Sequence, residues 1–522
     1  MQPNFKKWLW PTLFLALVFG FLIFWRLDRF SLWHDEADLS LLSKSILQNG
    51  LPLALVDGKF ITQWNGAEST SHYLWFFDTA PFLYLRAASF KLFGVNAWAA
   101  RFPFALLGFL SIIPLGFLFW RWTRNAAVTW LSLFLFAFNP WVLLYIRQSK
   151  TYPINFLGVG LLLLGFLNWE EKKKGTLLYA VGLILLFHAN YFICFLSLGG
   201  LALYTLFFTE GKEIKIRALL TTIITVALFC LPFFLIGSFE TRTNMMTHFP
   251  TVAQYFKKFG THLFYFNRQI VPLILVFVWL YWWKTSQWSL IQRKTLLLIT
   301  CIVLVGWFGV PVLNFDVLRY GFQLFPLLCF LMAVTILQIY KKNKIAGALT
   351  FVILWGTGLF QSFTLIKPEW PALKNYYLKG YADPIQIIPK MVAEKWQPGE
   401  YVYLNSSQHV WQFYSDIPLA YIAEPEKISP KVPPLEKKWT DRQVIRWWIG
   451  PDRVGLAQGP HISKEEIKKE WESLGHTYEI IDTKIPVLNW DLNSPIRYKH
   501  FLERFSDRPP NKETIQLLHR LK

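Results

Sequence analysis

The chain has little charge and few cysteines for its length. Only 16% of its 522 residues are Asp, Glu, Lys or Arg, against about 25% in an ordinary soluble domain. It has four cysteines, all in apolar segments: Cys194, Cys230, Cys301 and Cys329. We expect them to be small core residues, so they imply no disulfide framework and no metal framework. No GxGxxG loop of the dinucleotide-binding kind is present either.

Large apolar side chains are abundant instead. Hydrophobic residues make up 54% of the chain and aromatic residues 18%, with 26 Trp and 48 Phe. Many apolar runs approach the roughly twenty residues that cross a bilayer as a helix. The sequence therefore predicts a mainly α-helical, polytopic membrane protein of about eleven transmembrane helices: 8–25, 97–119, 126–146, 153–169, 176–189, 192–208, 218–237, 269–283, 295–314, 321–340 and 345–366.

The excess of positive charge follows the predicted spans. The net charge is +20, which in a soluble protein would suggest a nucleic-acid partner. Here the basic residues gather in short segments that all fall on one side of the predicted topology, and such segments are typical of the cytoplasmic face and of contacts with membrane lipids. We therefore expect no nucleic-acid partner. The segments contain Lys6 and Lys7; Arg121 and Arg124; Lys172 to Lys174; Lys212, Lys215 and Arg217; Lys284, Arg293 and Lys294; and Lys341, Lys342 and Lys344.

This pattern predicts the orientation and the domains. The N-terminus lacks a small-residue cleavage site, so the first span is expected to stay as an anchor with its start in the cytoplasm. A large first outer loop, 26–96, and a C-terminal segment, 368–522, then lie outside the cytoplasmic membrane. Residues 1–367 form the predicted transmembrane domain. Residues 368–522 carry Pro, charge and strand-like runs such as 400–406, which predicts a small extracytoplasmic α/β domain.

An acidic cluster stands out in the first outer loop, in the sequence HDEAD at 34–38. Asp38 has two equally weighted interpretations, a solvated loop charge or a functional group. Asp35 and Glu36 lie about ten residues beyond a span, beside Trp33. Apolar residues then recur at helical spacing over 39–49, which predicts an amphipathic helix in the membrane interface. A carboxylate held there can take a proton from a hydroxyl whose electrophile arrives from the lipid.

Four segments together resemble one family. They are SLWHDEA at 31–37, APFLYLRAASFKLFGVNAWAARFPFALLG at 80–108, NPWVLLYIRQSKTYPINFL at 139–157 and LRYGFQLFPLLCFLMA at 318–333. In order and spacing they are similar to the motifs of GT-C fold membrane glycosyltransferases, the superfamily of the protein O-mannosyltransferases and aminoarabinose transferases.

The resemblance implies a glycosyl transfer at the outer face of the cytoplasmic membrane. The donor would be a sugar on a polyprenyl phosphate, and the acceptor would be a hydroxyl of a lipid, a glycan or a protein. Asp35 is expected to act as the base in an inverting reaction. Glu36 is the second catalytic candidate, either as a base or by positioning the acceptor or a cation.

Cationic residues are expected where the phosphate leaves. Arg319, next to Tyr320, is the first candidate, and Lys150 with Arg147 is the second, because fixed positive charge stabilises a developing phosphate anion. The alternative for Arg319 and for Lys150 is that each side chain only reaches toward lipid headgroups.

Four further residues are candidates for the acceptor or donor pocket: His34, Tyr152, Asp78 and Arg101. Arg101 has a structural interpretation too, as the anchor of its helix. No cofactor follows from the sequence, and the one metal hypothesis is a divalent ion held by His188 with Asp35 or Glu36. The alternative for His188 is a hydrogen-bonded residue at a helix end.

Two other functions compete with this interpretation. A multi-pass transporter or flippase of lipid-linked glycans would be expected to show internal repeats and charges near the middle of the membrane, and neither is visible. A polymerase or ligase that uses a lipid-pyrophosphate donor fits the large first loop and its DEA sequence less well.

Overall fold

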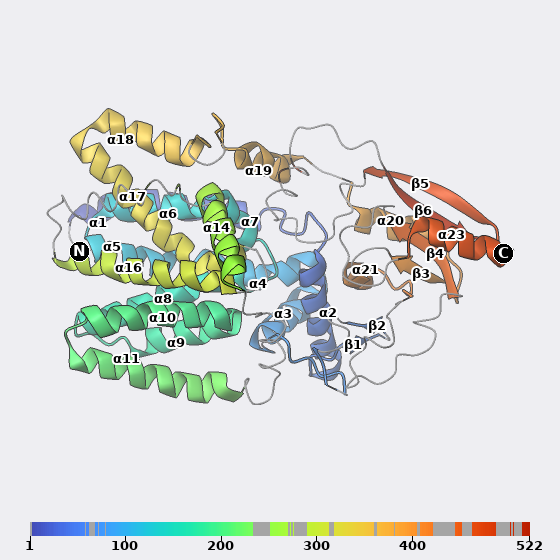
Figure 1. Cartoon of the computed structure of the whole chain (residues 1–522), viewed down its shortest axis with the longest axis horizontal. Coiled ribbons are helices and arrows are strands. Elements are labelled where there is room, and N and C mark those ends of the chain that lie inside the picture. The colour runs from blue at the N-terminus through green and yellow to red at the C-terminus, as the bar shows by residue number, and fades with distance from the viewer. Residues whose placement is uncertain are drawn as a thin grey trace. The chain divides into compact units, whose positions relative to one another are not determined.

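A computed structural model gives the three-dimensional arrangement of the chain (Figure 1). It describes all residues except the following: 1–2, 58, 62–67, 71, 79, 233–250, 270–271, 273–274, 276–289, 313–317, 360–362, 380–381, 405–407, 421–443, 451–461, 487–501, 503–504, 506–513 and 522.

The internal contacts divide the chain into two compact units. The helical unit comprises Met1–Trp25 and Phe102–Trp370, and the α/β unit comprises Arg26–Arg101 and Pro371–Lys522. The first loop therefore packs with the C-terminal segment, although the two are far apart in the sequence. The domain limits expected from composition, 1–367 and 368–522, stay a prediction.

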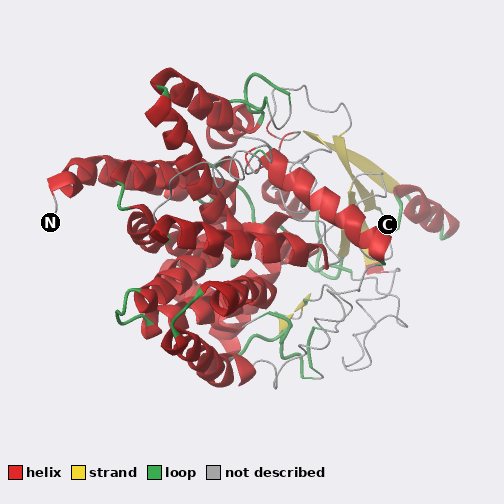
Figure 2. Ribbon diagram, turned by 60° about the vertical axis from the view of Figure 1, so that its left-hand side comes forward, coloured by secondary structure: helices red, strands yellow, loops and turns green. Residues whose placement is uncertain are grey.

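In the described residues of the helical unit, all regular secondary structure is helical, and helices are drawn in red in Figure 2. Its elements are α1 (Pro3–Phe24), α4 (Ala97–Leu110, which starts in the α/β unit), α5 (Ile112–Thr123), α6 (Ala126–Ala137), α7 (Pro140–Ile146), α8 (Tyr152–Glu170), α9 (Thr176–Ala189), α10 (Tyr191–Phe208), α11 (Lys212–Thr225), η1 (Val226–Cys230), α14 (Val252–Gln269), α16 (Leu290–Gly309), η2 (Val310–Val312), η3 (Leu318–Leu324), α17 (Phe325–Lys342), α18 (Lys344–Phe351) and η4 (Val352–Gly356).

Several of these helices are long and apolar enough to cross a membrane. Among the described residues there are five: Ala97–Thr123, Tyr152–Glu170, Tyr191–Phe208, Arg293–Val312 and Tyr320–Lys342. Helices α6 and α7 make a sixth candidate, bent by 63°. Shorter apolar helices cover Trp10–Phe24, Thr176–Ala189 and Lys344–Gly356. The mainly helical fold is confirmed, whereas the count of eleven spans stays a prediction, and most of the span expected at 269–283 lies outside the described residues.

Asparagine side chains cap the starts of several apolar helices, among them α6, α7 and α10. Asn139 Oδ1 accepts hydrogen bonds from the backbone N–H groups of Trp141 and Val142 at 2.9 and 3.3 Å. Asn125 and Asn190 cap α6 and α10 in the same way. Each cap satisfies backbone donors that the first turn of a helix leaves without partners. The caps thereby set where these helices begin.

Helices α8 and α9 pack closely because glycines on each helix lie against the backbone of the other helix. A Cβ atom added at Gly165 would lie 2.4 Å from the backbone N of Tyr179, and one at Gly182 would lie 2.4 Å from the backbone N of Leu162. No other residue fits at such distances, and small residues are what allows helices to pack tightly inside membranes.

The α/β unit combines the first loop with the C-terminal segment. Its elements are α2 (His34–Asn49), β1 (Leu55–Val56), β2 (Lys59–Phe60), α3 (Ala80–Phe93), α19 (Glu369–Leu378, which starts in the helical unit), α20 (Pro384–Ala393), β3 (Tyr401–Leu404), α21 (Gln408–Tyr414), β4 (Ile445–Gly450), α23 (Lys464–Ser473), β5 (Tyr478–Pro486) and β6 (Thr514–Arg520).

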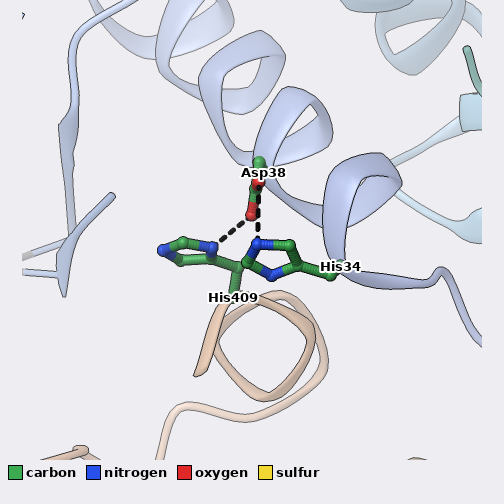
Figure 3. Close-up of side chains that lie close together, drawn as sticks. All are labelled: His34, Asp38 and His409. Carbon is green, nitrogen blue, oxygen red and sulfur yellow. Dashed lines mark ion pairs between the residues drawn. The ribbon is translucent and has the colours of Figure 1, made fainter. Parts of the chain in front are cut away.

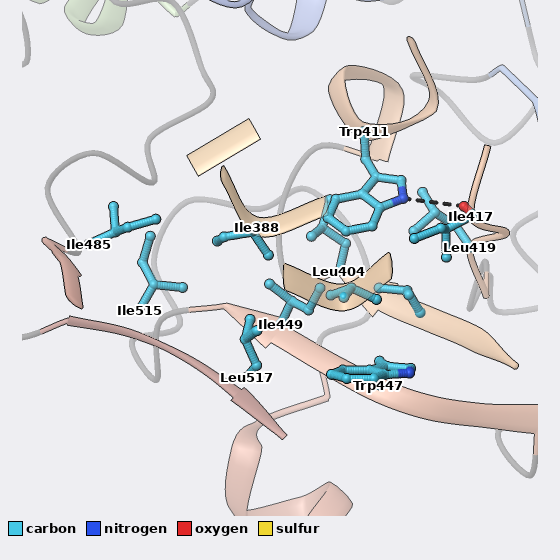
Figure 4. Packing of buried hydrophobic residues seen from close by; sticks show 12 residues of the cluster. Ile388, Leu404, Trp411, Ile417, Leu419, Trp447, Ile449, Ile485, Ile515 and Leu517 are labelled. Carbon is cyan, nitrogen blue, oxygen red and sulfur yellow. Dashed lines mark hydrogen bonds between the residues drawn. The ribbon is translucent and has the colours of Figure 1, made fainter. Parts of the chain in front are cut away.

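A four-stranded sheet with the order β3-β4-β6-β5 forms its centre. Strands β3 and β4 are parallel and the other pairs are antiparallel. Successive tryptophans of β4 serve opposite faces, as the alternation of side chains along a strand requires. Trp447 packs in the cluster of Figure 4, with Ile388 and Trp411, and Trp448 packs with Trp471 of α23. The small α/β region expected from the sequence and the strand expected at 400–406 are both present.

The four cysteines are buried and free, as their apolar surroundings predicted.

Candidate functional site

The acidic cluster forms the first turn of α2. The helix follows Trp33, whose backbone is extended, and the N–H of Trp33 donates a hydrogen bond to Glu36 Oε2 at 3.2 Å. The helix ends at Gly50, whose φ of 74° lies in the left-handed region that glycine adopts without strain. It therefore begins before residue 39, where the apolar spacing had placed its start, and the acidic residues belong to it.

Helix α2 is a core element of the α/β unit. Its leucines Leu41 and Leu42 are buried, and so are Ser40 and Ser43 on its polar side. The helix contacts α3 and α21, and Arg86 of α3 donates to the carbonyl of Leu39 at 3.0 Å and to Ser43 Oγ at 3.2 Å. The expectation of an interfacial helix with a lipid-facing side is wrong, because protein covers its polar side as well as its apolar side.

Glu36 forms an ion pair with Arg101. The guanidinium contacts both carboxylate oxygens, with Nε 3.0 Å from Oε1 and Nη2 2.7 Å from Oε2, and both side chains are buried. The same guanidinium donates to the carbonyls of Leu27, Phe30 and Ser31 at 2.8 to 3.0 Å. Arg101 thus holds the segment that leads into α2. These contacts support its structural interpretation, not a place in a substrate pocket, and they leave Glu36 poorly suited to act as a base.

Asp38 lies in a cluster with two histidines. Its carboxylate is fully buried; Oδ2 is 3.8 Å from His34 Nε2, and Oδ1 contacts Nδ1 of His409 on α21. Figure 3 shows Asp38 directed at both imidazoles, whose rings are stacked with centroids 5.0 Å apart. The interpretation of Asp38 as a solvated loop charge is wrong, because the C-terminal segment supplies a partner and covers it.

The surroundings of His409 are strongly acidic. Burial disfavours the charged imidazolium, but the negative charge of Asp38 and its hydrogen bond outweigh burial, and Glu68 and Asp35 act in the same direction. The pKa of His409 is therefore raised above its usual value. Three carboxylates thus exert their charge on this one buried imidazole.

Asp35 differs from the other two acids of its turn. Its side chain is partly exposed, whereas those of Glu36 and Asp38 are at 0% exposure. Among the three, Asp35 is the one residue that is partly exposed. Asp78, also partly exposed, accepts a hydrogen bond from the indole N–H of Trp75 at 3.4 Å.

Arg147 caps the end of α1 in the helical unit. Its Nη1 donates to the carbonyls of Leu22, Ile23 and Trp25 at 2.7 to 2.9 Å. These are carbonyls that the last turn of a helix leaves without intrahelical partners. The guanidinium is buried in this contact, which points to a structural role and away from donor phosphate.

The other phosphate and pocket candidates of the helical unit lie near the start of α8 and in η3. Lys150 precedes α8 and is partly exposed. Tyr152 opens α8 and packs against Tyr145 and Phe322. Tyr320 is buried beside Leu196 and Val310. Arg319 belongs to η3, but its side chain lies outside the described residues.

His188 sits in the last turn of α9, where Nε2 lies 3.2 Å from the carbonyl oxygen of Phe229. This is the hydrogen-bonded helix-end role foreseen as its alternative. His188 belongs to the helical unit, and Asp35 and Glu36 belong to the α/β unit. A metal ion held by His188 with Asp35 stays a prediction, whereas the pairing of Glu36 with Arg101 makes Glu36 an unsuitable ligand.

Sequence analysis missed His409 and Arg86. His409 lies in an unremarkable stretch, and only the folded α/β unit brings it to Asp38. Glu68, a charged residue of the first loop, is buried.

Comparison with known proteins gives a likeness in structure alone. No protein-family model matches the chain, and no curated protein sequence matches it. Solved structures do match. ArnT from Cupriavidus metallidurans bound to undecaprenyl phosphate is 14% identical, with a TM-score of 0.54 and 98% of each chain covered. The same enzyme in its apo state is 14% identical, with a TM-score of 0.52 over 99% of this chain and 98% of that one.

A third structure is the oligosaccharyltransferase of Archaeoglobus fulgidus in its apo form, 11% identical, with a TM-score of 0.48 over 85% of this chain and 70% of that one. The two ArnT structures show that this chain has the GT-C fold of membrane glycosyltransferases, as the four sequence motifs predicted.

Proposed function

We propose that the chain is a membrane glycosyltransferase that moves a sugar from a polyprenyl-phosphate donor to an acceptor hydroxyl, with Asp35 as the base. The observation that carries the proposal is the difference in burial among the three acidic residues in the first turn of α2. Glu36 and Asp38 are fully buried, the first against Arg101 and the second against His409, whereas Asp35 is partly exposed.

The fold supports the choice of donor. ArnT from Cupriavidus metallidurans, which shares the fold over nearly its whole length, was crystallised with undecaprenyl phosphate. A polyprenyl-phosphate sugar leaves behind that same kind of lipid phosphate. The chain would not need a nucleotide-binding loop for such a donor, and its sequence contains no GxGxxG motif.

The chemistry assigned to Asp35 is general-base catalysis. The carboxylate accepts the proton of the acceptor hydroxyl while the hydroxyl oxygen bonds to the anomeric carbon. The bond from that carbon to the phosphate oxygen breaks, and its electron pair leaves with the polyprenyl phosphate. Because attack and departure occur on opposite sides of the carbon, the configuration inverts. Assistance of this kind is worth about 10²–10⁴-fold in rate.

Lys150 and Arg319 are the proposed cations for the departing phosphate. Lys150 is partly exposed at the start of α8, and Arg319 lies in η3, before the apolar helix α17. A fixed positive charge near the phosphate lowers the barrier because it interacts more strongly with the leaving group than with the bound donor. Arg147 is no longer a candidate for this role, since it caps α1.

Glu36, the neighbour of Asp35 in the sequence, carries a negative charge of its own. Its ion pair with Arg101 compensates that charge. The proposal therefore rests on the accessibility of Asp35 and its place in the first turn of α2, not on repulsion between adjacent carboxylates.

A transfer assay in vesicles tests the proposal. Purified protein is reconstituted with radiolabelled polyprenyl-phosphate sugar and a membrane extract as the source of acceptor. We expect Asp35→Asn, which keeps the shape and removes the charge, to lower transfer by about 10²–10⁴-fold. Elution on gel filtration should remain that of the parent. Asp416→Asn is the matched control, because that side chain is fully exposed and its loss should leave transfer unchanged.

The assay also distinguishes glycosyl transfer from the competing function, a flippase. A flippase would move the labelled lipid across the bilayer and release no free polyprenyl phosphate. Transport without release, or equal transfer by the parent and Asp35→Asn, would overturn the proposal.

A further inference from the structure

We infer that His34, Asp38 and His409 form a zinc site that fastens α2 to α21. Each residue offers one ligand atom, and the three atoms lie within 4.8 Å of one another. The inference is independent of the proposed glycosyl transfer, since its experiment measures bound metal.

The chemistry of the three side chains selects the metal. Two imidazole nitrogens and one carboxylate oxygen suit zinc, which prefers nitrogen and oxygen ligands at about 2.0–2.2 Å. Magnesium and calcium prefer sets made of oxygen alone. Tetrahedral zinc ligands at those lengths lie about 3.4 Å apart, and His34 Nε2 is 3.8 Å from Asp38 Oδ2. Small side-chain rotations would therefore bring the atoms to zinc.

The placement of the ligands favours a well-held ion. His34 and Asp38 lie one helical turn apart on α2, so they face the same side. His409 approaches from α21, and Figure 3 shows the carboxylate directed at both rings. Asp38 and His409 are buried, with 0% and 4% exposure. Their rotamers are thus restricted by packing, which reduces the entropy lost when an ion binds.

The surrounding charge favours a dication. The Asp38 carboxylate lies between the two imidazoles, 3.8 Å from His34 Nε2 and in contact with His409 Nδ1. A doubly charged ion bound by these atoms offsets the buried negative charge of Asp38. The side chain of His34 is 24% exposed, so a fourth position on this side remains open to water.

The site would connect two distant parts of the chain. His34 and Asp38 belong to the first loop, and His409 belongs to the C-terminal segment. Because Asp35 lies between two of the ligands in the sequence, an ion at this place would also fix the backbone of the first turn of α2. Zinc would then act as a positioning element for the proposed base without touching the reacting atoms.

Metal binding by the full-length protein tests the inference. The protein is purified in detergent, treated with a chelator, given zinc, freed of unbound metal by gel filtration and measured by elemental mass spectrometry. We expect one zinc ion per parent chain. Asp38→Asn and His409→Gln should lower binding affinity by about 10–100-fold or more, since even groups that only orient a ligand have effects of that size.

Two further variants guard against misfolding and surface binding. His34→Gln removes a partly exposed ligand without altering the buried core, so it should fold as the parent does and still lose zinc. His476→Gln removes a partly exposed histidine in the turn after α23 and should keep the full stoichiometry. Replacing zinc with cobalt gives a second readout, a visible absorption band that the parent shows and His34→Gln lacks.

The result that would overturn the inference is a parent chain with no stoichiometric zinc, or equal zinc content in the parent and in folded His34→Gln and Asp38→Asn. Equal loss in His476→Gln would identify the bound metal as surface zinc only and would have the same consequence.

Discussion

Arg101 contacts both carboxylate oxygens of Glu36, and the pair is buried in the α/β unit. The contact shows that the acidic residues of the cluster differ in role, since Glu36 is part of a buried ion pair that holds the structure together. Arg101 also belongs to α4, whose next residue, Phe102, begins the second part of the helical unit. Within the α/β unit, the pair therefore secures the start of α2 to the start of α4.

The pair predicts a large loss of stability when it is broken. Arg101→Ala should lower the free energy of unfolding by about 3–5 kcal/mol, because it leaves the Glu36 carboxylate buried without its counter-charge. Arg124→Ala, which removes a mostly exposed arginine 3.8 Å from Glu171, is the control and should cost less than about 1 kcal/mol. Thermal unfolding of the detergent-solubilised protein measures the stability of both variants. An Arg101→Ala variant that melts at the same temperature as the parent would contradict a structural role for the pair.

The proposed phosphate cations predict a change in donor saturation. Lys150→Ala should raise the donor concentration needed for half-maximal transfer by about tenfold, the equivalent of about 1.4 kcal/mol. Arg319→Ala should weaken donor use more strongly, by about 2–5 kcal/mol, if the lost charge faced a desolvated phosphate. Arg147→Ala is the comparison, since it should lower stability through the loss of the α1 cap and leave saturation by the donor unchanged. Unaltered saturation in both Lys150→Ala and Arg319→Ala would remove the phosphate role.

The alternation of basic segments predicts the topology. Reporter fusions after Lys174 and after Pro368 should give opposite readouts, cytoplasmic for the first and extracytoplasmic for the second. A periplasmic-type alkaline phosphatase and a cytoplasmic fluorescent protein at each site provide reciprocal controls. Matching readouts at the two sites would mean that the predicted orientation is wrong.

A carboxylate on the sheet predicts that the stability of the fold decreases at acidic pH. Glu479 on β5 accepts hydrogen bonds from Lys395 Nζ at 2.8 and 2.9 Å and lies 2.9 Å from Nδ1 of His519. These contacts lower the pKa of Glu479 below its usual value. Since its folded pKa is the lower one, its contribution to stability is present above the unfolded value, about 4.3, and is lost as the pH falls through the folded value.

The melting temperature of Glu479→Gln should therefore fall less steeply than that of the parent between about pH 6 and pH 3.5. Glu465→Gln, at a mostly exposed position in the first turn of α23, is the control for the removal of a carboxylate. Parallel curves for the parent and Glu479→Gln would contradict the assignment.

The sequence was informative where the signal is local. Apolar runs predicted the helices, and the four motifs predicted the GT-C fold. The helix starts at Asn125, Asn139 and Asn190 were also locally encoded. Each of these side chains caps the backbone N–H groups two and three positions ahead of it. The strand at Tyr401–Leu404 was likewise visible from its own run of strand-forming residues.

Pairings between distant residues were not visible in this way. Asp38 and Asp35 have the same side chain and nearly the same neighbours, yet one is buried and the other is partly exposed. The difference comes from His409 on α21, which no spacing within the first loop can indicate. Glu36 and Arg101 present the same difficulty, since a single chain gives no sign of which charges meet after folding.

The glycine contacts between α8 and α9 bear on how the protein is made. A turn of only residues 171–175 joins the two helices, and their close backbone approach at Gly165 and Gly182 uses contacts that are local in the sequence. Such contacts can form without waiting for the rest of the chain. The two helices can thus associate as a hairpin while the ribosome is still synthesising the following segments. A bulky residue at Gly165 or Gly182 would then act early, on biogenesis, and reduce the amount of inserted protein even where later steps proceed normally.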